Sequence, residues 1–121
     1  MNVLVIEDHA TDRKLLSVIL TTEGHVVHER ASAEGALESA LALQPDIVLL
    51  DLQLPRVDGL SLVLQLKANE STRHIPLVAV TAYPEAYPRE ALLSAGCAAY
   101  VLKPIDTREL PKKLEELAGK R

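Results

Sequence analysis

The chain lacks most of the residues that several common functions require. It has no Phe, no Trp and only three Tyr among 121 residues, so it offers no aromatic platform on which the bases of single-stranded nucleic acid could stack. Its single cysteine, Cys97, excludes an internal disulfide and fits a reducing compartment. No run of basic residues exceeds two, and the formal net charge is −4, which argues against a large contact with a phosphate backbone.

Long hydrophobic runs are also absent. No apolar stretch approaches the length of a membrane span, and residues 1–6 carry no basic segment of the kind that begins a signal peptide. The chain has an ordinary globular composition, with 48% apolar and 25% charged residues. A single domain of this length buries roughly two-thirds of its unfolded surface. We therefore expect residues 1–121 to form one cytoplasmic domain.

Short apolar runs alternate with helical patterns along the whole chain. Strands are predicted at 2–7, 25–30, 47–51, 77–81 and 99–102. Helices are predicted at 11–23, 32–43, 60–68 and 88–95, with a fifth from near Asp106. Four strands are almost continuously apolar, which is typical of central strands in a parallel sheet, whereas residues 25–30 are weaker and suit a sheet edge. The alternation predicts an α/β fold with a parallel five-stranded sheet and helices on both faces.

Single residues mark several helix boundaries. Ser32 is expected to cap the second helix. Because Pro suits the first turn of a helix, the fourth helix should begin near Pro88, after a loop at 82–87. Asp106 should cap the fifth helix, and Pro111 should either cost this helix one hydrogen bond or delay its regular part.

The residues that finish the predicted strands suggest a functional site. They are Glu7 and Asp8 after the first strand, Asp51 at the end of the third, Thr81 at the end of the fourth and Lys103 after the fifth. Ligands of such folds bind outside the carboxyl ends of the strands, so these side chains should converge at one rim. A single Asp in such a place is most often a turn former or helix cap, but an ordered set at four strand ends is hard to obtain by chance.

Three neighbouring carboxylates repel one another strongly. Two unit charges about 4 Å apart repel by about 4 kcal/mol at an effective dielectric constant of about 20, so either a carboxylate is protonated or a cation lies among them. An all-oxygen site suits Mg²⁺. With Lys103 and Thr81 beside it, such a site could stabilise a phosphoryl group that moves onto one carboxylate.

The chain resembles a receiver domain of the two-component response regulators, and it is similar to the single-domain chemotaxis and cell-cycle regulators. Four motifs carry the resemblance in family order: VIEDH (5–9), DIVLLDLQLPRVDGL (46–60), HIPLVAVTAY (74–83) and GCAAYVLKPID (96–106). The resemblance covers essentially the whole chain. It implies a flavodoxin-like three-layer sandwich with strand order 2-1-3-4-5.

The resemblance also implies a role for each residue at the rim. Asp51 would accept phosphate from a phosphohistidine of a sensor kinase or phosphotransfer protein, and the domain would catalyse its own phosphorylation and dephosphorylation. Mg²⁺ would be bound by Glu7, Asp8 and Asp51, with the backbone carbonyl of Gln53 as a further ligand. Lys103 would pair with the phosphoryl oxygens.

Further residues would couple phosphorylation to a change of shape. Thr81 would move its hydroxyl onto the phosphate, and Tyr100 would turn inward into the space that Thr81 leaves. The Lys103–Pro104 peptide bond is expected to be cis, which positions Lys103. The small Ala82 would leave the phosphoryl pocket open.

The implied output is protein binding. Phosphorylation would alter the face formed by the fourth helix, fifth strand and fifth helix, which would control a downstream protein or a homodimer without contacting nucleic acid or entering a membrane. One alternative is a Mg²⁺-dependent enzyme acting on a small phosphorylated substrate, although the short loops predict no deep pocket. Another is a docking scaffold that is not phosphorylated, against which the complete set of rim residues argues. Met1, directly before the first strand, favours a free-standing protein over a domain of a longer regulator.

Overall fold

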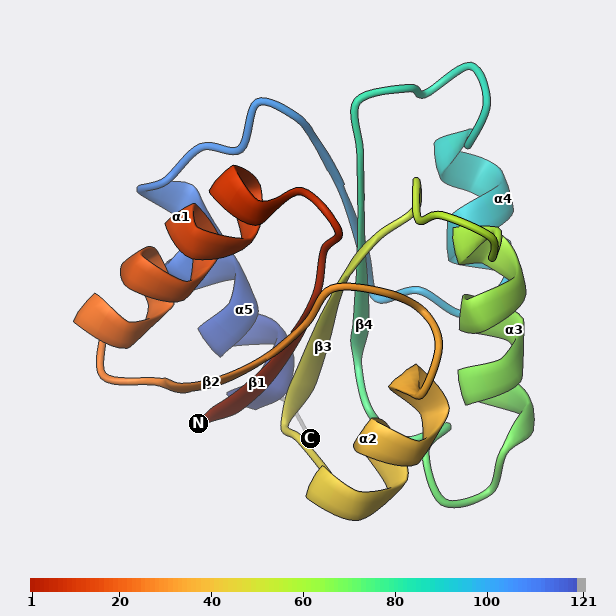
Figure 1. Cartoon of the computed structure of the whole chain (residues 1–121), viewed down its shortest axis with the longest axis horizontal. Helices are drawn as coiled ribbons and strands as arrows, with labels where there is room; N and C mark the ends of the chain where they lie inside the picture. The colour runs from red at the N-terminus through yellow and green to blue at the C-terminus, as the bar shows by residue number, and fades with distance from the viewer. Residues whose placement is uncertain (120–121) are drawn as a thin grey trace.

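The predicted alternation of strands and helices is present in the computed structural model, which describes residues 1–119 (Figure 1). The strands are β1 (Asn2–Ile6), β2 (Val26–Arg30), β3 (Ile47–Asp51), β4 (Leu77–Thr81) and β5 (Ala99–Leu102). The helices are α1 (Ala10–Thr22), α2 (Ala36–Leu43), α3 (Gly59–Ala68), α4 (Arg89–Ser94) and α5 (Glu109–Gly119). Lys120 and Arg121, the last two residues of the predicted domain, lie outside the described residues.

The five strands form one parallel sheet in the order β2-β1-β3-β4-β5, which confirms the flavodoxin-like arrangement. β3 and β4 are buried along their whole length, whereas β2 lies at the sheet edge and is partly exposed, as its weaker apolar pattern predicts. The register pairs Asp51 with Val80 and Thr81 with Leu102. Consequently, the strands finish together at one rim.

Helices cover both faces of the sheet, with α1 and α5 on one face and α2, α3 and α4 on the other (Figure 1). Successive residues of a strand point to opposite faces, and β1 follows this rule. Val5 packs in the core with residues of α1 and α5, while Leu4 packs in the core with residues of α2, α3 and α4. Both cores consist mainly of aliphatic side chains, as the scarcity of aromatic residues requires. Across residues 1–119, no helix combines the length and apolar character needed to cross a membrane.

The start of α2 differs from the prediction, because Ser32 does not cap it. The chain turns once more after Ser32, with the backbone N–H of Ala36 donating to the carbonyl of Ala33 at 3.0 Å. Gly35 then adopts a φ of 77°, and the helix begins at the next residue. Glycine enters this left-handed region at little cost, so a tight turn replaces the expected early helical turn.

Two prolines mark the starts of α4 and α5. Pro88 directly precedes α4, as its restricted backbone predicts. Before α5, Asp106 Oδ1 accepts hydrogen bonds from the backbone N–H groups of Arg108 at 2.9 Å and Glu109 at 3.1 Å. The regular helix starts at Glu109, so Pro111 lies in its first turn, where a backbone N–H would have no partner within the helix. The delayed start predicted from Pro111 is therefore confirmed.

Candidate functional site

The rim at the carboxyl ends of the strands gathers the side chains that the sequence pattern singles out. Glu7 and Asp8 follow β1, Asp51 ends β3 and Lys103 follows β5. The backbone N–H of Lys103 donates to the carbonyl of Thr81 at 2.9 Å, which ties the chain after β5 to the end of β4. The register of the strands therefore positions these side chains, because each is attached at or next to the end of a hydrogen-bonded strand.

Lys103 lies at the centre of the site. Its Nζ donates to Glu7 Oε1 at 2.9 Å, to Asp51 Oδ2 at 3.2 Å and to Asp12 Oδ2 at 3.2 Å. The side chains of Glu7 and Asp51 are only 1% and 6% exposed, so their bonds to Lys103 form in surroundings that hold little water. An ammonium group has three N–H donors, and the three carboxylates accept all of them.

Asp12 and Arg13 also belong to the site, although the sequence analysis did not identify them. Both lie in the first turns of α1, which starts beside the rim. Arg13 Nη1 donates to the backbone carbonyl of Glu7 at 3.0 Å and to that of Asp8 at 3.4 Å, so it holds the backbone of the acidic pair. An acid in the first turn after a rim strand was the available signal for Asp12. The helix dipole favours an acid in the first turn of any helix, so an acid at this position does not by itself indicate a functional role.

Three carboxylates of the rim could hold a metal ion together. Glu7, Asp8 and Asp51 each offer one oxygen, and these oxygens lie within 4.8 Å of one another. They carry more negative charge than Lys103 alone can balance. A set of hard oxygen ligands, with Asp8 on the exposed side, suits Mg²⁺, which usually keeps several of its waters. The residues therefore fit the ion that the sequence pattern predicts.

The crowding of charge shifts the pKa of two groups. Burial, and after it a hydrogen bond with Asp51, raises the pKa of Glu7 to about 7, against the opposing effect of the hydrogen bond from Lys103. Burial lowers the pKa of Lys103, but its hydrogen bond with Glu7 and the charge of Asp51 outweigh burial and raise the pKa overall. Lys103 is thus a permanent positive charge, while the raised pKa of Glu7 lets this carboxylate take a proton near neutral pH.

Asp51 presents its two oxygens to different partners. Oδ2 accepts from Lys103, and Oδ1 accepts from the backbone N–H of Gln53 at 3.0 Å. The following loop folds back so closely that a Cβ atom on Gly59 would lie 2.4 Å from Leu52 Cα. These contacts give the Asp51 carboxylate a defined orientation. The role of the Gln53 carbonyl as a metal ligand stays a prediction.

Thr81 is fully buried at the end of β4, and the loop that follows engages its hydroxyl. Thr81 Oγ1 accepts a hydrogen bond from the backbone N–H of Tyr83 at 2.9 Å. Because the hydroxyl is the acceptor in this bond, its own proton is available to another group. The neighbouring Ala82 is exposed and, with Asp12 and Lys103, lines a cavity of about 400 Å³ beside the rim. A larger side chain at position 82 would fill part of this opening.

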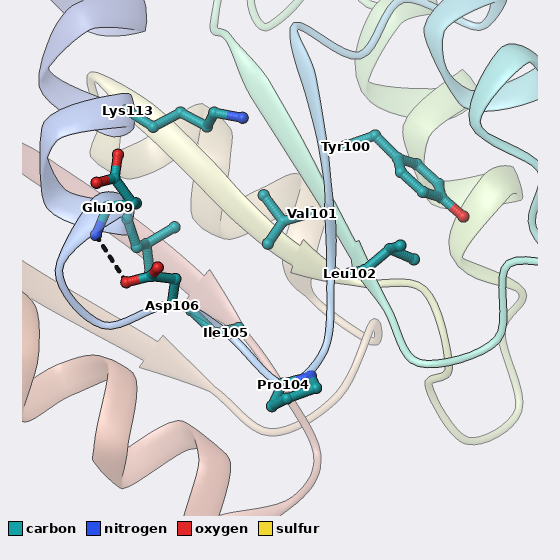
Figure 2. Close-up of a pocket in the computed structure, with 9 residues that line it drawn as sticks. Tyr100, Val101, Leu102, Pro104, Ile105, Asp106, Glu109 and Lys113 are labelled. Carbon is teal, nitrogen blue, oxygen red and sulfur yellow. Dashed lines mark hydrogen bonds between the residues drawn. The ribbon is translucent and has the colours of Figure 1, made fainter.

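Tyr100 is turned inward. Its ring is buried in the core beneath α4, and its hydroxyl donates to the backbone carbonyl of Tyr87. Figure 2 shows the ring on the opposite side of β5 from Val101, which faces a cavity of about 240 Å³ between β5 and α5. The ring is inward while the loop still engages the Thr81 hydroxyl, so this position of Tyr100 does not depend on Thr81 leaving its place. The predicted coupling of the two side chains on phosphorylation stays a prediction. The Lys103–Pro104 peptide bond is cis, as predicted.

Sequence comparison relates the chain to a known family. The sequence profile of the family described as "Response regulator receiver domain" matches residues 3–115. The chain is 34% identical over 118 residues to the polar-differentiation response regulator DivK of Brucella ovis, and the alignment covers 98% of this chain and 96% of that protein. It is 32% identical, with the same coverage, to the DivK protein of Brucella anthropi.

Solved structures with the same fold include two receiver domains. One belongs to a sensor histidine kinase of Pseudomonas aeruginosa and has a magnesium ion coordinated in its active-site cleft; its identity to this chain is 31%, its TM-score is 0.89, and the match covers 98% of this chain and 97% of that one. The other is a CheY-like response regulator receiver domain protein of Methanospirillum hungatei, with 25% identity and a TM-score of 0.90 over 98% of this chain and 94% of that one.

Proposed function

Because the chain belongs to the response regulator receiver domain family, we propose that Asp51 is its phosphoacceptor and that Lys103 pairs with the phosphoryl group that Asp51 receives. The contact of 3.2 Å between Lys103 Nζ and Asp51 Oδ2 carries the proposal, since it joins a permanent cation to a carboxylate at the end of a buried strand. The donor would be a phosphohistidine of a kinase or phosphotransfer protein in the cytoplasm.

The proposed reaction needs little more than orientation and charge. An oxygen of Asp51 attacks the phosphorus atom, so that a phosphorus–oxygen bond forms while the phosphorus–nitrogen bond of the donor breaks. The N–H of Gln53 and the ammonium of Lys103 orient the carboxylate, and Lys103 offsets the negative charge that the phosphoryl group brings. Water then attacks the phosphorus atom of the aspartyl phosphate, the bond between phosphorus and the Asp51 oxygen breaks, and inorganic phosphate leaves while Asp51 returns to a carboxylate. The domain would thus catalyse both its own phosphorylation and its own dephosphorylation.

Mg²⁺ is the cofactor that we propose for this reaction. Glu7, Asp8 and Asp51 would hold it, with the backbone carbonyl of Gln53 as a further ligand. When bound, the ion would neutralise the carboxylates and the phosphoryl oxygens. Arg13 supports this role, because its bonds to the carbonyls of Glu7 and Asp8 keep the acidic pair at the rim.

We further propose that the signal leaves through α4, β5 and α5. Thr81 would keep its bond from the N–H of Tyr83 and donate its hydroxyl proton to a phosphoryl oxygen, which would draw the loop between β4 and α4 towards Asp51. The same loop includes Tyr87, whose carbonyl accepts the hydroxyl of Tyr100, so a movement of the loop would reach β5.

The face formed by α4, β5 and α5 has features that support a protein partner. Leu102 is 51% exposed on β5, and the adjoining cavity is lined by the apolar Val101 and Ile105 and by the charged Glu109 and Lys113 (Figure 2). Apolar groups beside charges of both signs are suited to contact with another protein. We propose a downstream signalling protein as the partner, with a second copy of this chain competing for the same face.

Intact-mass spectrometry after incubation with acetyl phosphate tests the phosphoacceptor role. The wild-type chain should gain the mass of one phosphoryl group in Mg²⁺ and none in EDTA. Asp51→Asn should gain none, because an amide is a poor nucleophile. Glu38→Gln, which alters an exposed acid of α2, is the matched control and should be modified like the wild type.

Two outcomes would contradict the proposal. A phosphoryl adduct on Asp51→Asn would assign the acceptor to another residue. If neither acetyl phosphate nor a phosphorylated histidine protein modifies the wild type, the chain acts instead as a docking scaffold.

A further inference from the structure

The three carboxylates that accept the N–H donors of Lys103 are of two kinds. Glu7 and Asp51 are buried and belong to the group of oxygens that suits Mg²⁺. Asp12 does not belong to that group. Its side chain comes from the first turn of α1, is 39% exposed, and reaches Lys103 Nζ with Oδ2 at 3.2 Å.

Lys103 is the dominant partner of Asp12 among the described residues. The other side chain near the Asp12 carboxylate in the ion-pair geometry is His9, whose Nδ1 lies 3.6 Å from the same oxygen and whose side chain is 67% exposed. Such a long, solvated contact contributes little. The orientation of the Asp12 carboxylate is therefore set by Lys103.

We propose that Asp12 is a positioning residue that competes with the phosphoryl group for Lys103. The inference rests on the phosphoacceptor function proposed above. A phosphoryl oxygen can bond to Lys103 only by taking one N–H donor from a carboxylate, since all three are in use. Glu7 and Asp51 would share their charge with a divalent cation at the rim, whereas Asp12 would keep its own. Asp12 is thus the partner of Lys103 whose full negative charge stays in competition with the phosphoryl group.

The charge of Asp12 also opposes the arrival of an anion at Asp51. Both Asp12 Oδ2 and Asp51 Oδ2 lie 3.2 Å from Lys103 Nζ, so these oxygens are no more than twice that distance apart. That separation is inside the Debye length of about 8 Å at physiological salt, so screening is incomplete. With an effective dielectric constant between those of a protein surface and water, removal of the charge should strengthen anion binding by about three- to tenfold.

Beryllofluoride, a mimic of the phosphoryl group on a carboxylate, is the probe that tests the inference. It is titrated into each protein at saturating Mg²⁺, and binding is followed by the backbone amide signals in NMR spectra. Asp12→Asn should bind about three- to tenfold more tightly than the wild type. Asp12→Glu keeps the charge and should bind like the wild type. Glu23→Gln removes an exposed acid just beyond the other end of α1 and is the matched control.

The outcomes separate the inference from the function on which it rests. If the wild type binds beryllofluoride and Asp12→Asn binds equally or less tightly, Asp12 does not compete, and the phosphoacceptor function stands. If Asp12→Asn and Glu23→Gln both bind more tightly, net charge is the cause and the specific role of Asp12 is overturned. If the wild type and all three variants fail to bind in Mg²⁺, the proposed function falls and the inference falls with it.

Discussion

Lys103 explains how a buried acid such as Glu7 is tolerated at the end of β1. Glu7 Oε1 accepts from the ammonium, and Oε2 accepts from the backbone N–H of His9 at 3.2 Å. Both bonds favour the charged carboxylate, yet burial and the nearby Asp51 outweigh them and leave the pKa of Glu7 at about 7. The charge at this residue is therefore only partly compensated by the protein, and the compensation depends on pH.

The stability of the metal-free protein should consequently fall between about pH 5 and pH 8, with Glu7 as a main cause. The pKa of Glu7 is raised from 4.5 to about 7 in the folded chain, so within this window the folded chain binds more protons than the unfolded chain. The contribution of Glu7 is fully present below its unfolded pKa and is lost as pH rises through its folded pKa. The loss should be on the order of 3 kcal/mol, measured by urea unfolding in EDTA.

Glu7→Gln isolates this effect, because its side chain does not titrate. The free energy of unfolding of the wild type, minus that of Glu7→Gln, should decrease as pH rises, whereas Glu38→Gln should follow the wild type. Added Mg²⁺ should restore stability to the wild type at high pH, since it binds the carboxylate form. A difference between wild type and Glu7→Gln that stays constant with pH would contradict the prediction.

The site was largely predictable from sequence at the scale of single residues. Glu7, Asp8, Asp51 and Lys103 each adjoin a strand end, and parallel strands bring such positions together in any fold of this class. Asp12 was not predictable in the same way. Its bond to Lys103 joins residues 91 positions apart and depends on how α1 sits beside the chain that follows β5.

At the scale of elements, the loop between β3 and α3 is tied to the end of β3 by backbone contacts. The backbone N–H of Gly59 donates to the carbonyl of Leu52 at 3.1 Å, and Gln53 pairs with Asp58 in an antiparallel bridge. The loop thus folds back onto the strand that ends in Asp51. This packing limits the positions open to the Asp51 carboxylate.

Gly59→Ala should destabilise the protein by roughly 2–4 kcal/mol. The added Cβ would lie 2.4 Å from Leu52 Cα and 2.6 Å from the Leu52 carbonyl oxygen, and these backbone atoms can move only if the loop shifts. Urea unfolding measures the change. Gly119→Ala, where nothing lies within 4 Å of the added Cβ, is the control and should be neutral or slightly stabilised. Equal stability of the two variants would mean that the loop relaxes freely around the new methyl group.

The order and type of the elements were predictable because each apolar run is bounded by turn residues and followed by a helical pattern. The start of α4 was also predictable, since Pro88 restricts the backbone on both sides. The start of α2 was not. Ser32 is a favoured capping residue, but Gly35 offers a turn with positive φ, and the choice between them depends on how Ala36 packs in the core.

At the scale of the whole molecule, β5 connects the rim to the proposed output face. Lys103 follows the strand directly, and Tyr100, three residues earlier, bonds to the loop before α4. The strand is hydrogen-bonded to β4 along its length, and the aliphatic cores on both faces of the sheet are closely packed. Because such a core does not deform continuously, a shift at the rim should appear as a change in loops and helix ends and leave the sheet in place.

Thr81→Ala should separate binding at the rim from the response of this face. The variant keeps Asp51 and Lys103, so it should still bind beryllofluoride in Mg²⁺. Without the hydroxyl, the loop before α4 is not drawn towards the bound group, and the amide signals of α4, β5 and α5 should shift by less than about half of the wild-type change. NMR titration measures both effects in one experiment, and Thr81→Ser, which keeps the hydroxyl, should respond like the wild type. If the signals of Thr81→Ala shift as far as those of the wild type, the hydroxyl is not the link, and the signal leaves the rim through Lys103 and β5.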